Sequence, residues 1–299
     1  MVSNTAGPVE DPGGVEAPTR RRAAVLGSPI RHSLSPLLHT AAYAALGLTG
    51  WHYGAVECDE PNLPAFLKRL GPEWVGLSLT MPLKRVALQV ADEISPLSRA
   101  VGAANTLLLG PAGHPWRAEN TDVAGIRTAL REAGLQRVET AVILGAGGTA
   151  QATLAALRDL GATQPVVLVR DPTRAAALYA AAERLGVHPT VQGGLPHTDL
   201  PEAEVIISTL PPGAADPLAA QRWVGRPVVL DVVYSPWPTR LAAAARAAGC
   251  RAVGGTAVLL HQAAAQVELM TGHAAPLEAM RRALDNATGR SDPLAYSGR

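Results

Sequence analysis

Residues 140–150 read Thr-Ala-Val-Ile-Leu-Gly-Ala-Gly-Gly-Thr-Ala, and this stretch decides which fold the chain adopts. Its apolar run is typical of a buried strand, and a GxGGxA turn then leads into an alanine-rich helical pattern that lasts to about Leu160. A glycine turn between a strand and a helix is the setting in which a dinucleotide pyrophosphate is bound. The alternative is a tight strand-to-helix turn that binds no ligand.

Each position of this turn has a physical role. Gly145 permits the sharp turn, Gly147 lets the backbone approach a pyrophosphate, and the helix beginning near Thr149 directs unpaired N–H groups at the phosphates. Ala150 occupies the last position of the fingerprint, where alanine is an accepted replacement for glycine. The predicted phosphate-binding residues are therefore Gly145, Ala146, Gly147, Gly148, Thr149 and Ala150.

The end of the next predicted strand, residues 165–170, should meet the adenosine ribose of the dinucleotide. Arg170 and Arg174 are suited to bind a 2′-phosphate, which favours NADP(H) as the cofactor. Asp171 could instead accept a hydrogen bond from a free 2′-hydroxyl, so NAD stays open at this point. A third possibility is that Asp171 caps a helix and the two arginines are solvated.

Short apolar runs alternate with amphipathic stretches from Ala23 onward, which predicts an α/β protein of parallel strands and crossover helices. We expect the chain to cross between two α/β units near Asn120. The predicted strands are 23–27, 51–57, 74–79, 104–109, 140–144, 165–170, 204–208 and 227–233. The predicted helices begin near residues 36, 61, 82, 123 and 149, span residues 255–271, and include one more after Pro276.

Composition and charge exclude several classes of protein. The chain has 299 residues, of which 47% are hydrophobic, and its net charge of +1 provides no basic surface for nucleic acid or anionic lipid. Two cysteines, and eight histidines without HxH or HExxH spacing, predict no metal site and reduced thiols. No secretory signal and no apolar run of membrane-spanning length is present, so we expect a cytoplasmic protein that binds neither nucleic acid nor membrane.

The choice of basic residues is uneven. Of the 26 lysines and arginines, only Lys68 and Lys84 are lysines. Lys68 lies on what should be the wet face of a helix, where arginine would serve equally well. Lys84 follows Thr-Met-Pro-Leu near a predicted strand end, where an amine that exchanges a proton could be required.

Four polar clusters follow predicted strands of the first half. Taken singly, Ser35, Thr80 and Asp122 could each cap a helix. Taken together, the hydroxyls, amide, amine and carboxylate of adjoining strand ends predict a site for a small, polyhydroxylated, anionic molecule. The clusters are Ser33-Leu-Ser35-Pro36, Ser78-Leu-Thr80-Met-Pro-Leu-Lys84, Ala104-Asn105-Thr106 and Glu119-Asn120-Thr121-Asp122.

These clusters also resemble the signature motifs of the shikimate dehydrogenases, in the same order, from about residue 23 to residue 285. The matching segments are 27–36, 79–84, 102–106, 120–122, 145–148 and 255–263. The resemblance implies an N-terminal, mostly parallel α/β substrate domain, a Rossmann-type NADP-binding domain, and reversible oxidation of shikimate to 3-dehydroshikimate in aromatic amino acid biosynthesis. It places a substrate domain at 23–121 and a dinucleotide domain at 122–255, with helices of about 256–286 packed back on the substrate domain. The remaining segments are a disordered tail at 1–22 and a tail at 287–299.

The resemblance also assigns roles to single residues. Lys84 matches the catalytic lysine and Asp122 its acidic partner, while Ser33 and Ser35 resemble the pair that binds the substrate carboxylate. Thr80, Asn105, Asp122 and Gln262 resemble the groups that hold ring hydroxyls, Tyr234 completes the pocket, and Gly255 joins the cofactor-binding residues. Three positions depart from the family pattern: Ser78 replaces an expected asparagine, and Val169 and Asp171 differ from the expected Asn-Arg-Thr.

Hydride transfer to a ketone needs a proton donor and a group that orients it, and Lys84 and Asp122 can fill these roles. The sequence leaves open which of the two holds the transferred proton. One alternative is a quinate or dual quinate/shikimate dehydrogenase that uses NAD, although Ser35 favours shikimate. Another is a non-catalytic Rossmann sensor, against which the presence of both Lys84 and Asp122 argues. A monomer and a homodimer are equally consistent with the sequence.

Overall fold

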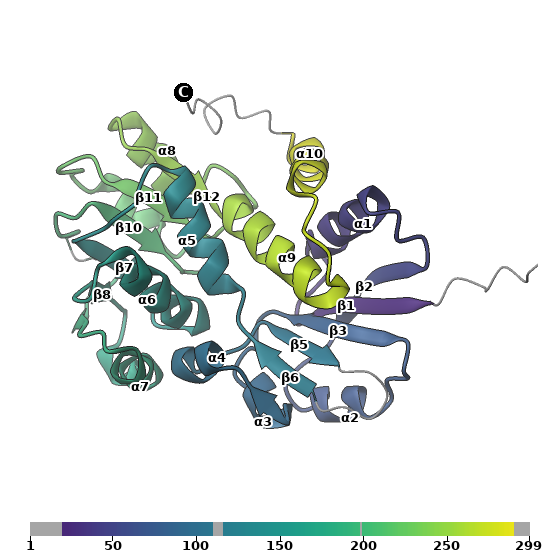
Figure 1. Cartoon of the computed structure of the whole chain (residues 1–299). Helices are drawn as coiled ribbons and strands as arrows, with labels where there is room; N and C mark the ends of the chain where they lie inside the picture. Colours follow the sequence, from purple (N-terminus) through teal and green to yellow (C-terminus); the bar gives the residue numbers. More distant parts are fainter. Residues whose placement is uncertain (1–19, 110–115, 198, 290–299) are drawn as a thin grey trace, which may run out of the picture.

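The chain forms two six-stranded sheets with helices packed around them, as seen in a computed structural model (Figure 1). The structure describes residues 20–109, 116–197 and 199–289. The predicted α/β class with a Rossmann-type second unit is confirmed. Residues 110–115, which follow the predicted strand 104–109, lie outside the described residues.

The first sheet is mixed and has the strand order β2-β1-β3-β5-β6-β4. Strands β1, β2 and β3 are parallel, whereas β5 runs antiparallel to both β3 and β6. This sheet brings the ends of β1 and β3 together, because β1 pairs with both β2 and β3. Its strands are β1 (Arg21–Gly27), β2 (Trp51–Glu57), β3 (Trp74–Leu79), β4 (Glu93–Ile94), β5 (Thr106–Leu109) and β6 (Trp116–Glu119).

The second sheet is entirely parallel and has the order β12-β11-β10-β7-β8-β9. Its central strand β7 is buried on both faces: Ile143 packs into one apolar cluster and Val142 into the other. The strands are β7 (Ala141–Leu144), β8 (Val166–Leu168), β9 (Thr190–Gln192), β10 (Val205–Ser208), β11 (Val228–Asp231) and β12 (Ala252–Gly254).

The helices cover both sheets. In the first half they are α1 (Ser35–Ala45), α2 (Leu63–Leu67), α3 (Ala87–Val90) and α4 (Pro96–Val101). In the second half they are α5 (Asp122–Glu132), α6 (Gly148–Leu160), α7 (Ala176–Leu185), α8 (Arg240–Ala247), α9 (Gly255–Thr271) and α10 (Leu277–Thr288), with 3-10 turns at Pro172–Arg174 and Asp216–Ala220.

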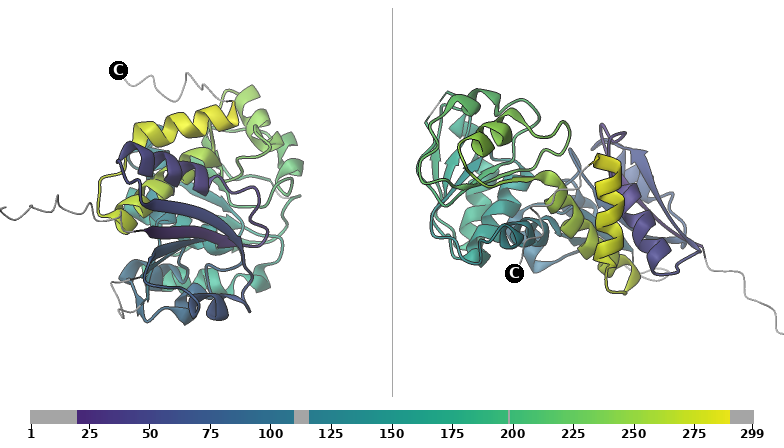
Figure 2. Two further views of the ribbon diagram at one scale, coloured as in Figure 1. Left: turned by 90° about the vertical axis from the view of Figure 1, so that its right-hand side faces the viewer. Right: turned by 90° about the horizontal axis from the view of Figure 1, so that it is seen from above.

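Helix α9 lies between the two sheets and contacts both units (Figures 1 and 2). It begins directly after strand β12, packs along α5, and continues past β3 and β5 of the first sheet. Helix α10 then returns beside α1, so the last helices of the chain pack against the first unit. One helix therefore carries side chains to the junction of the two units.

Three predicted boundaries are wrong. No helix begins at Pro82, because the carbonyl of Lys84 accepts the amide of Ala104 (2.8 Å) and residues 81–86 form turns before α3. The tail predicted for residues 1–22 wrongly includes Arg21 and Arg22, which hydrogen-bond to neighbouring chain segments and begin β1. The tail predicted for residues 287–299 wrongly includes the last residues of α10, which continues to Thr288.

Within the described ranges, none of the helices combines the length and the apolar character needed to cross a bilayer.

Substitution of Gly255 tests how closely the start of α9 approaches the backbone of Val232, which follows β11. A Cβ atom at this position would overlap the carbonyl of Val232, so we expect Gly255→Ala to lower the free energy of unfolding by about 1–3 kcal/mol or more. Gly54→Ala in β2 is the control, because its Cβ would meet only the His52 side chain at 3.7 Å. Thermal denaturation followed by circular dichroism measures both, and equal midpoints for the two variants would contradict the close approach.

Candidate active site

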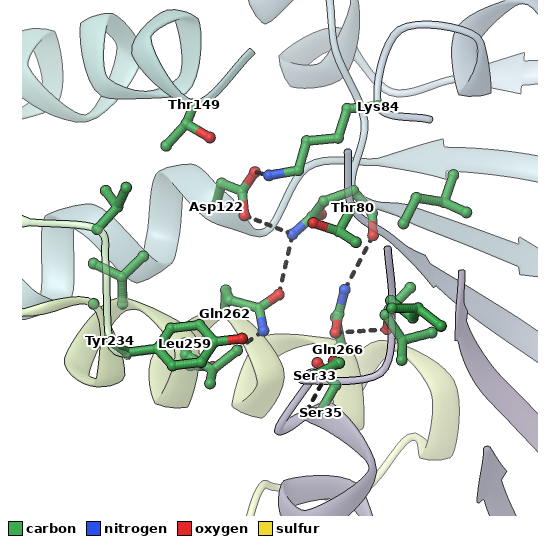
Figure 3. A pocket seen from close by; sticks show the side chains of 18 of the residues that line it. Ser33, Ser35, Thr80, Lys84, Asp122, Thr149, Tyr234, Leu259, Gln262 and Gln266 are labelled. Carbon is green, nitrogen blue, oxygen red and sulfur yellow. Dashed lines mark hydrogen bonds and ion pairs between the residues drawn. The ribbon is translucent and has the colours of Figure 1, made fainter. Parts of the chain in front are cut away.

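A cavity of about 270 Å³ opens where the two units meet, and residues of both line it (Figure 3). The structure brings together in it all the residues predicted to bind substrate or to act in catalysis. These are Ser33, Ser35, Thr80, Lys84, Asn105, Asp122, Tyr234 and Gln262. Thr149 and Gly255, which were predicted to bind cofactor, also line this cavity.

An ion pair joins Lys84 and Asp122 at the cavity wall. Lys84 Nζ lies 2.6 Å from Asp122 Oδ2, and the two side chains are 19% and 10% exposed. Asp122 is the first residue of α5, yet its carboxylate faces Lys84 instead of capping the helix. Both ends of the pair are mostly shielded from water, which strengthens their mutual attraction.

Asn105 holds the second oxygen of Asp122. Its Nδ2 lies 2.9 Å from Asp122 Oδ1, 2.8 Å from Thr121 Oγ1 and 3.2 Å from Gln262 Oε1. Its Oδ1 accepts the backbone N–H of Thr121 at 2.8 Å, which fixes the carboxamide in this orientation. The carboxylate therefore has a donor on each oxygen and a defined position in the cavity.

The loop before α1 delivers two hydroxyl groups. Ser33 Oγ accepts the backbone N–H of Ser35 at 3.3 Å, and Ser35 is itself the first residue of α1, so it does not act as the predicted helix cap. Glu57 anchors the start of this loop, since it accepts the hydroxyl of Ser28 at 2.6 Å. From the second unit, the Tyr234 hydroxyl donates to the carbonyl of His32 at 3.4 Å, and burial raises the pKa of Tyr234.

The glycine turn has room for a ligand backbone. Gly145 has φ = +105°, a conformation suited to glycine, and a Cβ there would come within 2.7 Å of Thr209 Oγ1. Gly147 has open space around the position of a Cβ, and α6 begins at the next residue. A Cβ at Gly148 would lie 3.9 Å from the Lys84 side chain, so this turn sits directly beside the lysine.

Arg170, Asp171 and Arg174 lie exposed after strand β8. Asp171 Oδ1 accepts both the hydroxyl (2.7 Å) and the amide (3.0 Å) of Thr173, and these hydrogen bonds hold the pKa of Asp171 below its usual value. The alternative in which Asp171 caps a short helix is thus confirmed for its side chain. The Asp171 carboxylate is thus hydrogen-bonded within its own turn. Arg170 and Arg174 are the cationic side chains next to it at the end of β8.

Among the lining residues without a predicted role, Ser78 and Gln266 are buried and polar. Ser78 is the position at which the family pattern has an asparagine. Gln266 follows Gln262 by four residues, a spacing that puts two residues on the same face of a helix, and this signal could have identified it. For a metal, the described part of the chain offers no group of three or more His, Cys, Asp or Glu side chains.

This arrangement defines a class of protein. A glycine turn at the carboxyl end of a parallel sheet, open to a ligand backbone, faces a cavity with a lysine–carboxylate pair. Two-domain, dinucleotide-dependent oxidoreductases have this construction, in which one unit holds the nucleotide and the other the substrate.

Comparison with known proteins narrows the class. Residues 25–107 match the shikimate dehydrogenase substrate binding domain, and residues 255–284 match the shikimate 5′-dehydrogenase C-terminal domain. Shikimate dehydrogenase (NADP(+)) of Moorella thermoacetica is 35% identical over 92% of this chain and 96% of its own length. This chain therefore belongs to the shikimate dehydrogenase family.

Solved structures agree with this membership. The crystal structure of Mycobacterium tuberculosis shikimate dehydrogenase is 44% identical and covers 89% of this chain and 99% of its own, with a TM-score of 0.78. The enzyme of Thermus thermophilus in complex with NADP(H) and shikimate is 32% identical, covers 89% and 99%, and has a TM-score of 0.75.

A buried histidine stands behind the cavity wall. His39 of α1 stacks on Tyr53 with ring centroids 3.9 Å apart, and its Nε2 lies 3.4 Å from Gln266 Oε1. Burial lowers the pKa of His39 to about 3, so the ring is neutral in the folded protein. Its usual pKa of about 6.5 returns on unfolding.

The difference between the folded and unfolded pKa values of His39 decides how stability depends on pH. Between these two pKa values the unfolded state binds the extra proton, so His39 lowers stability as the pH falls below about 6.5. From pH 7.5 to pH 5 we expect the parent to lose about 2 kcal/mol more than His39→Phe. Urea denaturation of both proteins at the two pH values measures the difference, and parallel losses would show that His39 is not buried in its neutral form.

Proposed function

We propose that this protein is an NADP-dependent shikimate dehydrogenase that catalyses the reversible reduction of 3-dehydroshikimate to shikimate. One observation carries the proposal: the Lys84–Asp122 pair lies in a cavity lined with hydroxyl and amide groups, directly beside the glycine turn. This arrangement matches the needs of a reaction that moves a hydride and a proton at one carbon–oxygen bond.

The second unit fits the dinucleotide. The open space at Gly147 and the N-terminal turn of α6 suit a pyrophosphate, and residues 145–150 would hold it. Arg170 and Arg174 would bind the 2′-phosphate, and the engagement of Asp171 by Thr173 favours NADP over NAD. When bound, NADPH supplies the hydride that reduces the ketone.

Lys84 of the first unit and Asp122 at the start of α5 transfer and position the proton. Reduction of a ketone leaves negative charge on its oxygen, and Lys84 Nζ donates the proton that neutralises it. Asp122, held by Asn105 on its other oxygen, keeps the Lys84 amine in place. In the reverse direction Lys84 receives the proton from the hydroxyl group that is oxidised.

The other cavity residues hold the substrate. We assign the substrate carboxylate to Ser33 and Ser35, which the loop before α1 presents together. Ring hydroxyls are assigned to Thr80, Asn105 and Gln262 with the catalytic pair. Tyr234 closes the cavity from the second unit, and Gly255 places the start of α9 against it.

We also propose a domain organisation and a cellular location for this protein. The substrate unit comprises residues 23–121 with 256–286 packed on it, and the dinucleotide unit comprises residues 122–255. The protein acts in the cytoplasm on a small molecule, without nucleic acid or membrane partners, as a monomer or a homodimer.

A panel of steady-state rates tests the function directly. Shikimate and quinate are each assayed with NADP⁺ and NAD⁺ at 340 nm. We expect the highest kcat/KM for shikimate with NADP⁺. A preference for quinate with NAD⁺ would replace the proposal by a quinate dehydrogenase, and dinucleotide binding without turnover of either acid would identify a sensor.

Lys84→Ala should lower kcat by about 10²–10⁴-fold, the usual contribution of a general acid or base, and leave the Kd for shikimate within a few-fold of the parent. Lys84→Arg should fail as well, because a guanidinium does not release its proton in proteins. Stopped-flow or steady-state rates give kcat, and calorimetry gives the Kd.

Lys68→Arg is the matched control, since Lys68 is the other lysine of the chain and lies exposed after α2. It should keep the parental kcat and KM. A Lys84→Ala protein with near-parental kcat would remove the lysine from the mechanism.

A further inference from the structure

Gln266 lines the substrate cavity but has no part in the chemistry described above. It lies on α9 one turn after Gln262, and its side chain is 1% exposed (Figure 3). A carboxamide buried this deeply must have its polar atoms paired, so its partners indicate what it does.

Its four hydrogen-bonding positions are all occupied by protein groups. Nε2 donates to the backbone oxygen of Asn105 at 3.1 Å and to Thr106 Oγ1 at 2.9 Å. Oε1 accepts the Ser78 hydroxyl at 2.8 Å and faces His39 Nε2 at 3.4 Å. A carboxamide offers two donors and two acceptor sites, so Gln266 has none left for a substrate. It can act only through its neighbours.

On one side, Gln266 is hydrogen-bonded to Ser78, which is itself hydrogen-bonded to Tyr53. Tyr53 donates its hydroxyl proton to Ser78 Oγ at 2.6 Å, and burial raises the pKa of Tyr53, which keeps that proton in place. The single proton of Ser78 is directed at Gln266. Ser78 is therefore left with one lone pair and no proton to offer the cavity.

On the other side, hydrogen bonds connect Gln266 through Thr106 and Asn105 to the catalytic pair. Because Thr106 Oγ1 accepts from Gln266, its own proton is free to go to Asn105 Oδ1 at 3.0 Å. That bond helps to turn Asn105 Nδ2 toward Asp122 Oδ1. A continuous series of hydrogen bonds thus connects Tyr53 through Gln266 and Asn105 to Asp122.

We propose that Gln266 is a positioning residue for shikimate, which fixes the Ser78 and Asn105 walls of the cavity at once. It also supplies, from α9, the carboxamide that the family pattern places at position 78 itself. Because Ser78 Oγ lies 2.8 Å from Gln266 Oε1, the longer side chain of an asparagine at position 78 would reach toward the Gln266 carboxamide. This inference rests on the proposed function, because shikimate is the ligand being positioned.

Gln266→Leu removes all four hydrogen bonds at nearly constant volume. We expect the KM for shikimate to rise about tenfold, as the loss of oriented hydrogen bonds at a binding site implies. The kcat should stay within about threefold of the parent, because the Thr121 amide and Lys84 still hold Asn105 and Asp122. The Kd for NADP⁺, measured by fluorescence, should not change.

Leu269→Ala is the control on the same helix, since Leu269 is 40% exposed and does not line the cavity. It should keep both parental constants. A merely structural role for Gln266 would lower the active fraction, and hence the apparent kcat, without raising KM. That outcome, or a parental KM in Gln266→Leu, would overturn the inference.

The exchange of carboxamides is tested by a double-variant cycle. Ser78→Asn alone should raise the KM by overpacking against Gln266 and Tyr53, and Gln266→Ala alone should raise it by leaving Ser78 and Thr106 without their partner. The combined variant should return the KM to within about threefold of the parent. A combined KM equal to the product of the two single effects would overturn the exchange.

The proposed function and the positioning role of Gln266 are tested separately. A parent protein that does not turn over shikimate would overturn the proposed function and this inference together. An active parent whose Gln266 variants keep the parental KM would overturn the inference alone.

Discussion

The ion pair between Lys84 and Asp122 is the interaction on which the rest of the site depends. Two partly buried charges lose hydration, and their attraction offsets that cost only when geometry and further hydrogen bonds are favourable. Three features of the structure meet this requirement. Ala104 holds the backbone of Lys84, Asp122 starts helix α5, and Asn105 donates to the second carboxylate oxygen. The turns between β3 and α3 replace a regular helix for this reason.

Helix α9 ties this pair to the nucleotide side of the molecule. Gly255 lets its first turn touch the backbone that follows β11, and the next turns pass α5 and the first sheet. Gln262 and Gln266 then face the cavity from one side of the helix. One helix thus contacts both units and carries groups to the cavity between them, which suits the proposed reaction because it needs both ligands in one geometry.

The sequence was sufficient for the fold and most of the cavity, for identifiable physical reasons. Strand β7 and the glycine turn are local patterns, and the motif residues fall at strand ends that a parallel sheet brings together. Features that depend on tertiary contacts could not be predicted. The antiparallel β5, the turns at 81–86 and the extension of β1 to Arg21 are each set by partners far along the chain. The role of Gln266 depends on Ser78, which lies 188 residues away.

The position of the catalytic pair can be checked in a crystal structure of this protein with shikimate bound. We expect Lys84 Nζ and an Asp122 carboxylate oxygen both to lie within about 3.2 Å of the same ring hydroxyl, on the side of the cavity that faces the glycine turn. The substrate carboxylate should contact Ser33 and Ser35. A bound shikimate whose ring hydroxyls all lie beyond hydrogen-bond reach of Lys84 would contradict this expectation.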